Sequence, residues 1–274
     1  MSTLIGIGIA VILILVGMIM KGGSIGGIIN IPALLMVMGG TIGVLIASFG
    51  MKDAMGMIKL FTGVAMKERT DERPKLIETL VGFAEKARRE GLLVLEEDAR
   101  EVDDPFLAKG VRLVVDGTDP DLVKDVVVTE LDAMEERHHY NQDMFKQGGA
   151  FAPTLGILAT VLSLVSVLQH LDQPDTLGPA ISAAFLATFY GVAVANIFYL
   201  PVANALKKRT QQEVGERVLM IEGVLSIQSG DNPRVLAEKL WSFMPPDARE
   251  PAEAASGASA PADGAAAEPA PEAA

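Results

Sequence analysis

Four long runs of the chain contain no Asp, Glu, Lys or Arg, and each is predominantly apolar. These runs cover residues 1–20, 22–51, 147–171 and 176–206. A helix that crosses a bilayer needs about 20 mostly apolar residues, and all four runs are long enough. The pattern therefore predicts four transmembrane helices, at about residues 4–20, 30–50, 151–169 and 179–202. The second helix is expected to begin at Asn30-Ile31-Pro32, and Pro153 is expected in the first turn of the third.

Between the second and third runs the hydrophobic pattern changes to that of amphipathic helices. Ile77, Leu80 and Ala84 recur at helical spacing, with charged residues on the other faces. Gly91, Asp104-Pro105 and Asp119-Pro120 are typical helix stops and starts. The last of these helices is expected to join the third span without a break. We therefore predict an all-α integral membrane protein with a helical cytoplasmic domain between spans two and three.

The expected domain organisation follows from these patterns. The stretch after the fourth span has apolar residues at spacings of three and four, and from Pro246 onward Ala, Pro, Gly and Glu dominate. The predicted parts are 1–50 (two membrane helices), 51–147 (cytoplasmic helical domain), 148–203 (two membrane helices), 204–245 (cytoplasmic C-terminal helices) and 246–274 (a disordered acidic tail rich in Ala and Pro).

The basic residues predict the orientation of the spans. Fifteen of the 23 Lys and Arg residues lie between spans two and three, and seven lie after span four, including Lys207-Lys208-Arg209 directly at its end. Only Lys21 lies between spans one and two. Because basic residues near span ends stay cytoplasmic, we expect a multi-pass protein of the cytoplasmic (inner) membrane with both termini in the cytoplasm.

Composition excludes several classes of function. The net charge of −12 argues against a nucleic-acid partner, and the absence of cysteine excludes disulfides and thiolate metal sites. Glycine pairs such as Gly39-Gly40 lack the strand-then-helix context of a nucleotide site, and no carboxylate pair lies on an apolar face. We therefore expect neither an enzyme nor a resident cofactor or metal.

The spans carry hydroxyl groups but no group that can change its charge at mid-membrane. Proton relays in membranes rely on such ionisable groups, so either the chain moves no ions or a partner supplies the titrating acid. Hydroxyl oxygens, such as those of Thr160 and Thr188, are suitable ligands for a small cation. The alternative is that each hydroxyl bonds its own helix or a neighbouring one.

Small residues recur every fourth position in span four: Ala183, Ala187, Gly191 and Ala195. Such a stripe lets two helices approach closely in lipid. It predicts tight packing within the chain or against a neighbouring subunit.

Several short stretches together resemble a known family. They are 30–35 (NIPALL) with 39–41 (GGT), 85–93 (EKARREGLL), 114–120 (VVDGTDP), 148–156 (GGAFAPTLG) and 185–191 (FLATFYG). The chain is similar over about residues 1–245 to the flagellar motor stator subunits of the MotA type, within the MotA/TolQ/ExbB proton channel family. The resemblance implies a pentamer around a dimer of a MotB-like single-span partner that carries a membrane Asp and a peptidoglycan-binding domain. It also implies transport of H⁺ or Na⁺ and a rotor partner, FliG.

The resemblance also assigns roles to individual residues. Pro153 and Pro201 match the prolines that couple ion passage to torque, and Thr160 and Thr188 match hydroxyls near the partner's carboxylate in sodium-driven members. Ala187 stands where those members often have a second threonine, so the coupling ion stays open. Charged residues that meet the rotor are matched by Arg88, Arg89 and Glu96. The alternative for this charge run is a solvated helix face, with Glu85 pairing to an arginine one turn away.

Two other functions compete with the stator. A TolQ- or ExbB-like energising subunit would drive a periplasm-spanning partner instead of a rotor. It would have three spans where this chain has four. A structural four-helix scaffold would conduct nothing.

Overall fold

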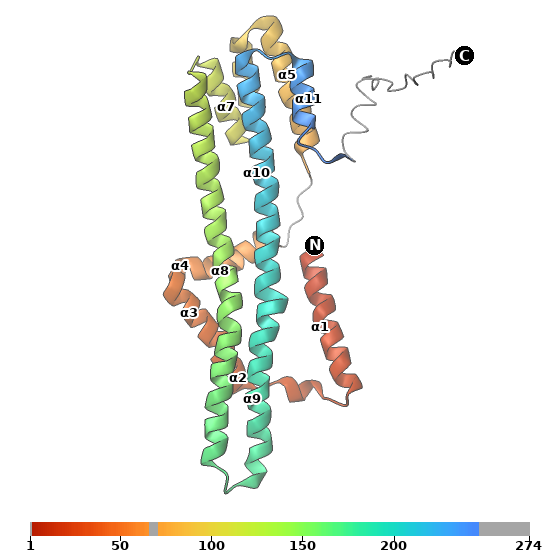
Figure 1. Ribbon diagram of the computed structural model, residues 1–274, viewed down its shortest axis with the longest axis vertical. Coiled ribbons are helices and arrows are strands. Elements are labelled where there is room, and N and C mark those ends of the chain that lie inside the picture. The colour runs from red at the N-terminus through yellow and green to blue at the C-terminus, as the bar shows by residue number, and fades with distance from the viewer. Residues whose placement is uncertain (1, 66–70, 247–274) are drawn as a thin grey trace, which may run out of the picture. The chain divides into compact units, whose positions relative to one another are not determined.

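A computed structural model describes residues 2–65 and 71–246 of the chain (Figure 1). All regular secondary structure within these ranges is helical. The expected tail, from residue 247 onward, lies outside the described residues. The helices are α1 Ser2–Met20, η1 Ile25–Ile28, α2 Ile31–Leu34, η2 Leu35–Gly39, α3 Gly40–Phe49, α4 Met51–Leu60, η3 Phe61–Ala65, α5 Arg73–Glu90, η4 Leu92–Val94, α6 Leu95–Glu101, α7 Pro105–Val115, α8 Pro120–Gln169, α9 Pro174–Val194, η5 Ala195–Tyr199, α10 Leu200–Ser229 and α11 Pro233–Trp241. Among the shorter helices η2, η3 and η5 are π-helical, whereas η1 and η4 are 3₁₀-helical.

Four helical stretches among the described residues are long and apolar enough to cross a membrane. They are Thr3–Met20, Ile31–Phe49, and parts of Pro120–Gln169 and Pro174–Ser229. The predicted all-α architecture with four spans is therefore confirmed.

The second span begins where its sequence indicates. The side chain of Asn30 accepts a hydrogen bond from the Ala33 N–H at 3.0 Å, and Pro32 occupies the first turn. An asparagine cap satisfies one of the orphan donors at a helix start, and a first-turn proline has none to lose. The span ends at Phe49, because Gly50 adopts a φ of 85°.

The third span differs from the expectation at its start. α8 runs without interruption for 50 residues, so Pro153 lies in the interior of a helix and not in its first turn. The expected join between the last cytoplasmic helix and the span is confirmed. A proline in a helix interior removes one backbone hydrogen bond, and here the carbonyl that it faces four residues earlier belongs to Gly149.

The fourth span also extends beyond its apolar run. α9 begins at Pro174, five positions before the expected Pro179, because the polar residues around Asp175 form its first turn. At the other end the π-helical turn η5 leads directly into α10, which continues to Ser229. Pro201 therefore lies in a continuous helix, and the predicted C-terminal helices begin as an extension of the span.

The described chain divides into two compact units, the first made of residues 2–65, 71 and 126–217 and the second of residues 72–125 and 218–246. Residues of the predicted segment 51–147 occur in both units. In the first unit, Met57, Met144 and Phe145 pack in the same buried cluster as Leu45 and Val202 of the spans. Apolar side chains on both sides of the expected boundaries join one core, which periodicity along the chain does not reveal.

In the second unit α5, α6, α7, α11 and the end of α10 pack together. Gly91, at a φ of 89°, ends α5, as its sequence indicates. Asp104 caps α7 by accepting hydrogen bonds from the N–H groups of Phe106 (2.8 Å) and Leu107 (3.2 Å). Gly223 of α10 leaves room for Leu80 of α5. Its core includes Ile77, Leu80, Leu95, Ala99, Val111, Val114, Leu236 and Leu240.

Candidate functional site

Two threonines from neighbouring spans meet at a cluster of oxygen atoms. The hydroxyl oxygens of Thr160 (α8) and Thr188 (α9) are 2.6 Å apart. The Thr160 hydroxyl also lies 2.8 Å from the carbonyl oxygen of Ala184 and 2.9 Å from that of Gly156. Each hydroxyl has one proton, so Thr160 can donate to one of these carbonyls while it accepts from Thr188. The two residues that the sequence placed on different helices are thus brought together.

This oxygen cluster is polar but cannot titrate. Both threonines are half-buried, and no charged residue occurs in the charge-free runs that contain them. Hydroxyl and carbonyl oxygens can replace part of the water shell of a small cation or hold a hydrogen-bonded water. They cannot accept and release a proton at physiological pH, so a titrating acid has to come from elsewhere.

The cluster lies at a close crossing of α8 and α9, here called the α8–α9 seam (Ala152, Gly156, Ala187 and Gly191). A Cβ on Gly191 would lie 2.5 Å from the Ala152 carbonyl oxygen, and one on Gly156 would lie 3.0 Å from that of Ala187. Such close backbone approach requires glycine at both positions. The seam holds the helices at the separation that lets the two hydroxyls touch.

The predicted small-residue stripe is mostly buried, with one correction. Ala187, Gly191 and Ala195 are buried, whereas Ala183 is only half-buried and its neighbour Ala184 is 1% exposed. The buried line therefore steps by three and then by four, because an α-helix repeats every 3.6 residues and a strict spacing of four drifts off the face. It packs within the chain, against α8 and the start of α2.

The two prolines do not meet. Pro153 lies at the α8–α9 seam, where its Cα is 3.1 Å from the Cβ position of Gly191. Pro201 instead lines a cavity between α1 and the η5–α10 stretch.

Tyr190 makes a contact that sequence reasoning did not assign. Its hydroxyl donates a hydrogen bond to the carbonyl of Ile28 and accepts one from the backbone N–H of Asn30 at 3.0 Å. It therefore ties α9 to the backbone just before α2. The only signal in the sequence is a tyrosine within a charge-free span, which alone does not identify its partner.

A second missed feature is a buried polar pair in the first unit. Gln142, 1% exposed, donates from its amide to the Thr210 hydroxyl at 2.9 Å. Thr210 in turn donates to the Leu206 carbonyl at 3.1 Å. This pair links α8 to α10 beyond the charge-free runs.

The predicted rotor residues lie in the second unit, at the end of α5 and the start of α6. Arg88, Arg89 and Glu96 are all exposed. Arg89 is 4.0 Å from Glu85, with 77% and 54% of the side chains exposed, and Glu96 pairs with Arg100 at 2.7 Å. Exposed pairs of this kind contribute little to stability, so the geometry fits both an interaction surface and a solvated face.

An ion pair fixes these two helices to each other. The Lys86 ammonium lies 2.8 Å from both carboxylate oxygens of Asp98. The hydrogen bond to Asp98 raises the pKa of Lys86, and desolvation by burial acts in the opposite direction. A raised lysine pKa gives stability that is complete below its unfolded value of about 10.4 and is lost only as the pH rises further. The pair is thus constant at physiological pH.

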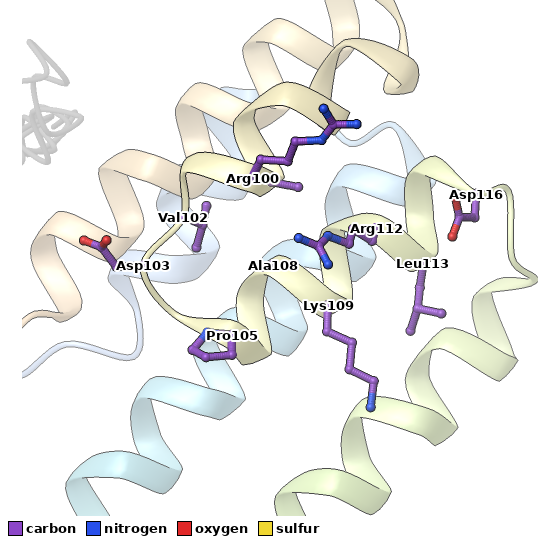
Figure 2. Close-up of a pocket in the computed structure, with 10 residues that line it drawn as sticks. Arg100, Val102, Asp103, Pro105, Ala108, Lys109, Arg112, Leu113 and Asp116 are labelled. Carbon is purple, nitrogen blue, oxygen red and sulfur yellow. The ribbon is translucent and has the colours of Figure 1, made fainter.

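A cavity of about 320 Å³ opens between α6 and α7, and Arg100 is among its lining residues. Figure 2 shows Arg100, Lys109 and Arg112 around it, with Asp103 and Asp116 toward its two ends. Its charges are mixed. The described residues contain no group of three or more His, Cys, Asp or Glu side chains that could hold a metal ion.

Comparison with known proteins gives consistent matches. Residues 98–218 match the model of the MotA/TolQ/ExbB proton channel family. The chain is 40% identical over 244 residues to motility protein A of Bacillus subtilis, covering 89% of this chain and 90% of that protein. It is 36% identical over 249 residues to motility protein A of Borreliella burgdorferi, covering 91% and 95%.

A solved structure has the same fold. The flagellar MotAB stator complex from Bacillus subtilis contains a chain that superposes with a TM-score of 0.84 at 40% identity, covering 92% of this chain and 99% of that one. Four spans, a Thr160–Thr188 oxygen cluster and near full-length similarity thus lead to one assignment. The chain belongs to the motility protein A group of the MotA/TolQ/ExbB proton channel family.

Proposed function

We propose that this chain is the stator subunit of a bacterial flagellar motor. With a MotB-like partner it forms a transmembrane ion channel that couples the flow of H⁺ or Na⁺ to torque on the rotor. The observation that carries the proposal is the Thr160–Thr188 oxygen cluster, with 2.6 Å between the hydroxyl oxygens, in spans that contain no Asp, Glu, Lys or Arg. The similarity to motility protein A and to a flagellar MotAB stator complex supports it.

The partner supplies what the spans lack. A single-span MotB-like protein with a membrane Asp would bring a carboxylate to the hydroxyl cluster, where the ion binds and leaves. The transmembrane potential provides about 2.3 kcal/mol per charge for each 100 mV, which is the energy available for one step. In this arrangement Thr160 and Thr188 hold the ion or its water, and the carboxylate titrates.

The assembly is a homo-oligomer, a pentamer by family resemblance, around the partner in the inner membrane. Lys207, Lys208 and Arg209 at the end of span four support cytoplasmic termini. Apolar side chains exposed on α1, α8 and α9 support extensive contact with lipid and with other subunits.

Torque leaves the membrane through the long helices and reaches FliG at the cytoplasmic unit. Pro153, at the α8–α9 seam, and Pro201, next to the π-turn η5, are the positions where a change at the ion site alters helix geometry. Arg88, Arg89 and Glu96 present exposed charges to the rotor.

Complementation in a motile bacterium tests the function. Deletion of the endogenous stator genes should abolish swimming, and expression of this chain with its partner should restore it, whereas expression of this chain alone should not. Swimming speed measured against external sodium and against external pH then identifies the ion. A partner-independent rescue, or complexes in the membrane that never restore rotation, would contradict the proposal.

Charge reversal at Arg88 tests the rotor contact. Arg88→Glu should reduce swimming, and reversal of an opposing charge on the rotor protein should restore part of it, because exposed pairs are worth about 0.2–1 kcal/mol each. Lys75→Glu, the same change at the other end of α5, is the matched control and should swim normally. Absence of any suppression by rotor variants would favour the solvated-face interpretation.

A further inference from the structure

A groove in the first unit lies between α1 and the stretch from η5 into α10. Its cavity measures about 510 Å³. One wall is a single face of α1, and the other follows the η5–α10 stretch as far as Lys208. The lining residues are Thr3, Gly6, Ile7, Ala10, Asn196, Ile197, Pro201, Asn204, Ala205 and Lys208. We call this cavity the α1 groove.

Helical spacing explains the shape of the α1 groove. Thr3, Gly6, Ile7 and Ala10 follow at steps of three, one and three, which places them on one face of α1 over two turns, about 10 Å. The small residues on this face and Ala205 opposite leave the space between the helices unfilled. A Cβ on Gly6 would meet no atom within 4 Å.

The α1 groove is polar at one end and apolar at the other. α1 and α10 run in opposite directions in Figure 1, so Thr3 and Lys208 lie at the same end. Asn204 and Lys208 are exposed, and neither has a hydrogen bond or ion pair within the described part of the chain. Toward the other end Ile7, Ala10 and Ile197 form the walls, and Asn196 donates its amide to the Val192 carbonyl of its own helix at 2.9 Å.

The apolar end of the α1 groove lies between two charge-free spans, whereas Asn204, Ala205 and Lys208 lie beyond the fourth span, toward the membrane interface. None of the span Thr3–Met20 is buried within the chain. A lysine at the membrane interface attracts anionic headgroups. An anionic lipid fits both ends of the α1 groove: its headgroup meets the cation, its ester groups meet the amide and hydroxyl, and its tail meets the apolar walls.

We propose that the α1 groove binds one anionic glycerophospholipid per subunit. Its phosphate pairs with Lys208, its glycerol and ester oxygens bond Asn204 and Thr3, and one acyl chain lies along Ile7 and Ile197. The lipid fills the space that the small residues leave between α1 and the rest of the first unit. Because Pro201 lines the same cavity, the bound lipid also packs against that proline. The site requires a membrane protein but not the stator function.

A glycine pair on α1 tests the acyl-chain part of the site. Gly6→Leu fills the α1 groove, whereas Gly8→Leu adds the same side chain at a position outside its lining; both positions have open space around Cβ. Full-length complexes are purified with the partner in mild detergent, and phosphatidylglycerol per subunit is measured by native mass spectrometry. Gly6→Leu should lose about one phosphatidylglycerol per subunit relative to Gly8→Leu.

A lysine pair tests the headgroup. Lys208→Gln, compared with Lys207→Gln outside the lining, should weaken phosphatidylglycerol retention about fivefold, which corresponds to about 1 kcal/mol. In nanodiscs of phosphatidylcholine, whose headgroup has no net charge, the two variants should retain equal amounts of lipid. Equal retention by both members of each pair would overturn the proposal. So would a Gly6→Leu complex with unchanged lipid but a smaller subunit number, which would assign the α1 groove to a second copy of the chain.

Discussion

Thr188→Val should abolish swimming while the protein still inserts and assembles. The substitution keeps the shape of the side chain but removes the hydroxyl that lies 2.6 Å from that of Thr160. Hydrogen bonds between membrane helices average only about 0.6 kcal/mol, so the loss of this bond leaves the fold intact. An ion that relies on these oxygens loses a ligand at every step. Membrane content, complex size and swimming speed are the measurements.

Thr41→Val is the matched control for this experiment. Thr41 also lies in a span and is buried, but its hydroxyl donates to the Val37 carbonyl of its own helix at 2.6 Å. The same change there should alter stability slightly and leave rotation of the motor unchanged. If both variants swim, the Thr160–Thr188 oxygen cluster is a packing contact. If Thr188→Val disappears from the membrane, its hydroxyl serves folding and the ion-path role loses its support.

Gly191→Ala disrupts the α8–α9 seam. The added Cβ would lie 2.5 Å from the Ala152 carbonyl oxygen, a backbone atom that cannot rotate away. The helices must separate, and overpacking of this kind costs about 1–3 kcal/mol. Separation also lengthens the contact between Thr160 and Thr188. We therefore expect a lower Tm of the purified complex and loss of swimming.

Gly178→Ala isolates the steric effect from helix propensity. Gly178 lies in the same helix, α9, with no atom within 4 Å of its Cβ position. Alanine favours a helix by about 1 kcal/mol over glycine, so this control should be as stable as the parent or more so. Equal Tm values for the two variants would show that α8 and α9 tolerate a wider crossing.

The spans were predictable because hydrocarbon imposes a simple requirement on sequence. Runs without charge revealed all four, and the cap at Asn30 with Pro32 located the start of the second. The helix ends were less predictable where a helix leaves the bilayer. Polar residues continue a helix in water as readily as apolar residues do in lipid. The end of an apolar run therefore does not mark the end of a helix, and α9 starts at Pro174 while α10 reaches Ser229.

The candidate site, like the fold, was predictable only in part. Thr160 and Thr188 were identified by residue type and by resemblance, and their contact followed from the close approach at Gly156 and Gly191. Tyr190 was not assigned, because its partners are backbone atoms of Ile28 and Asn30, and any residue has a backbone. Gln142 was not identified for a related reason, because a single amide on a long helix does not indicate which neighbour will face it.

The tyrosine contact makes the first half of the protein depend on the second during synthesis. Asn30 precedes Tyr190 by 160 positions, so at about 5–20 residues per second the ribosome needs roughly 8–30 s to deliver its partner. Until then the backbone at the entrance of span two has polar groups without that partner in an apolar surrounding. A nascent chain halted before span four would keep those groups exposed, a chemical mark by which membrane proteases could distinguish unfinished molecules from finished ones.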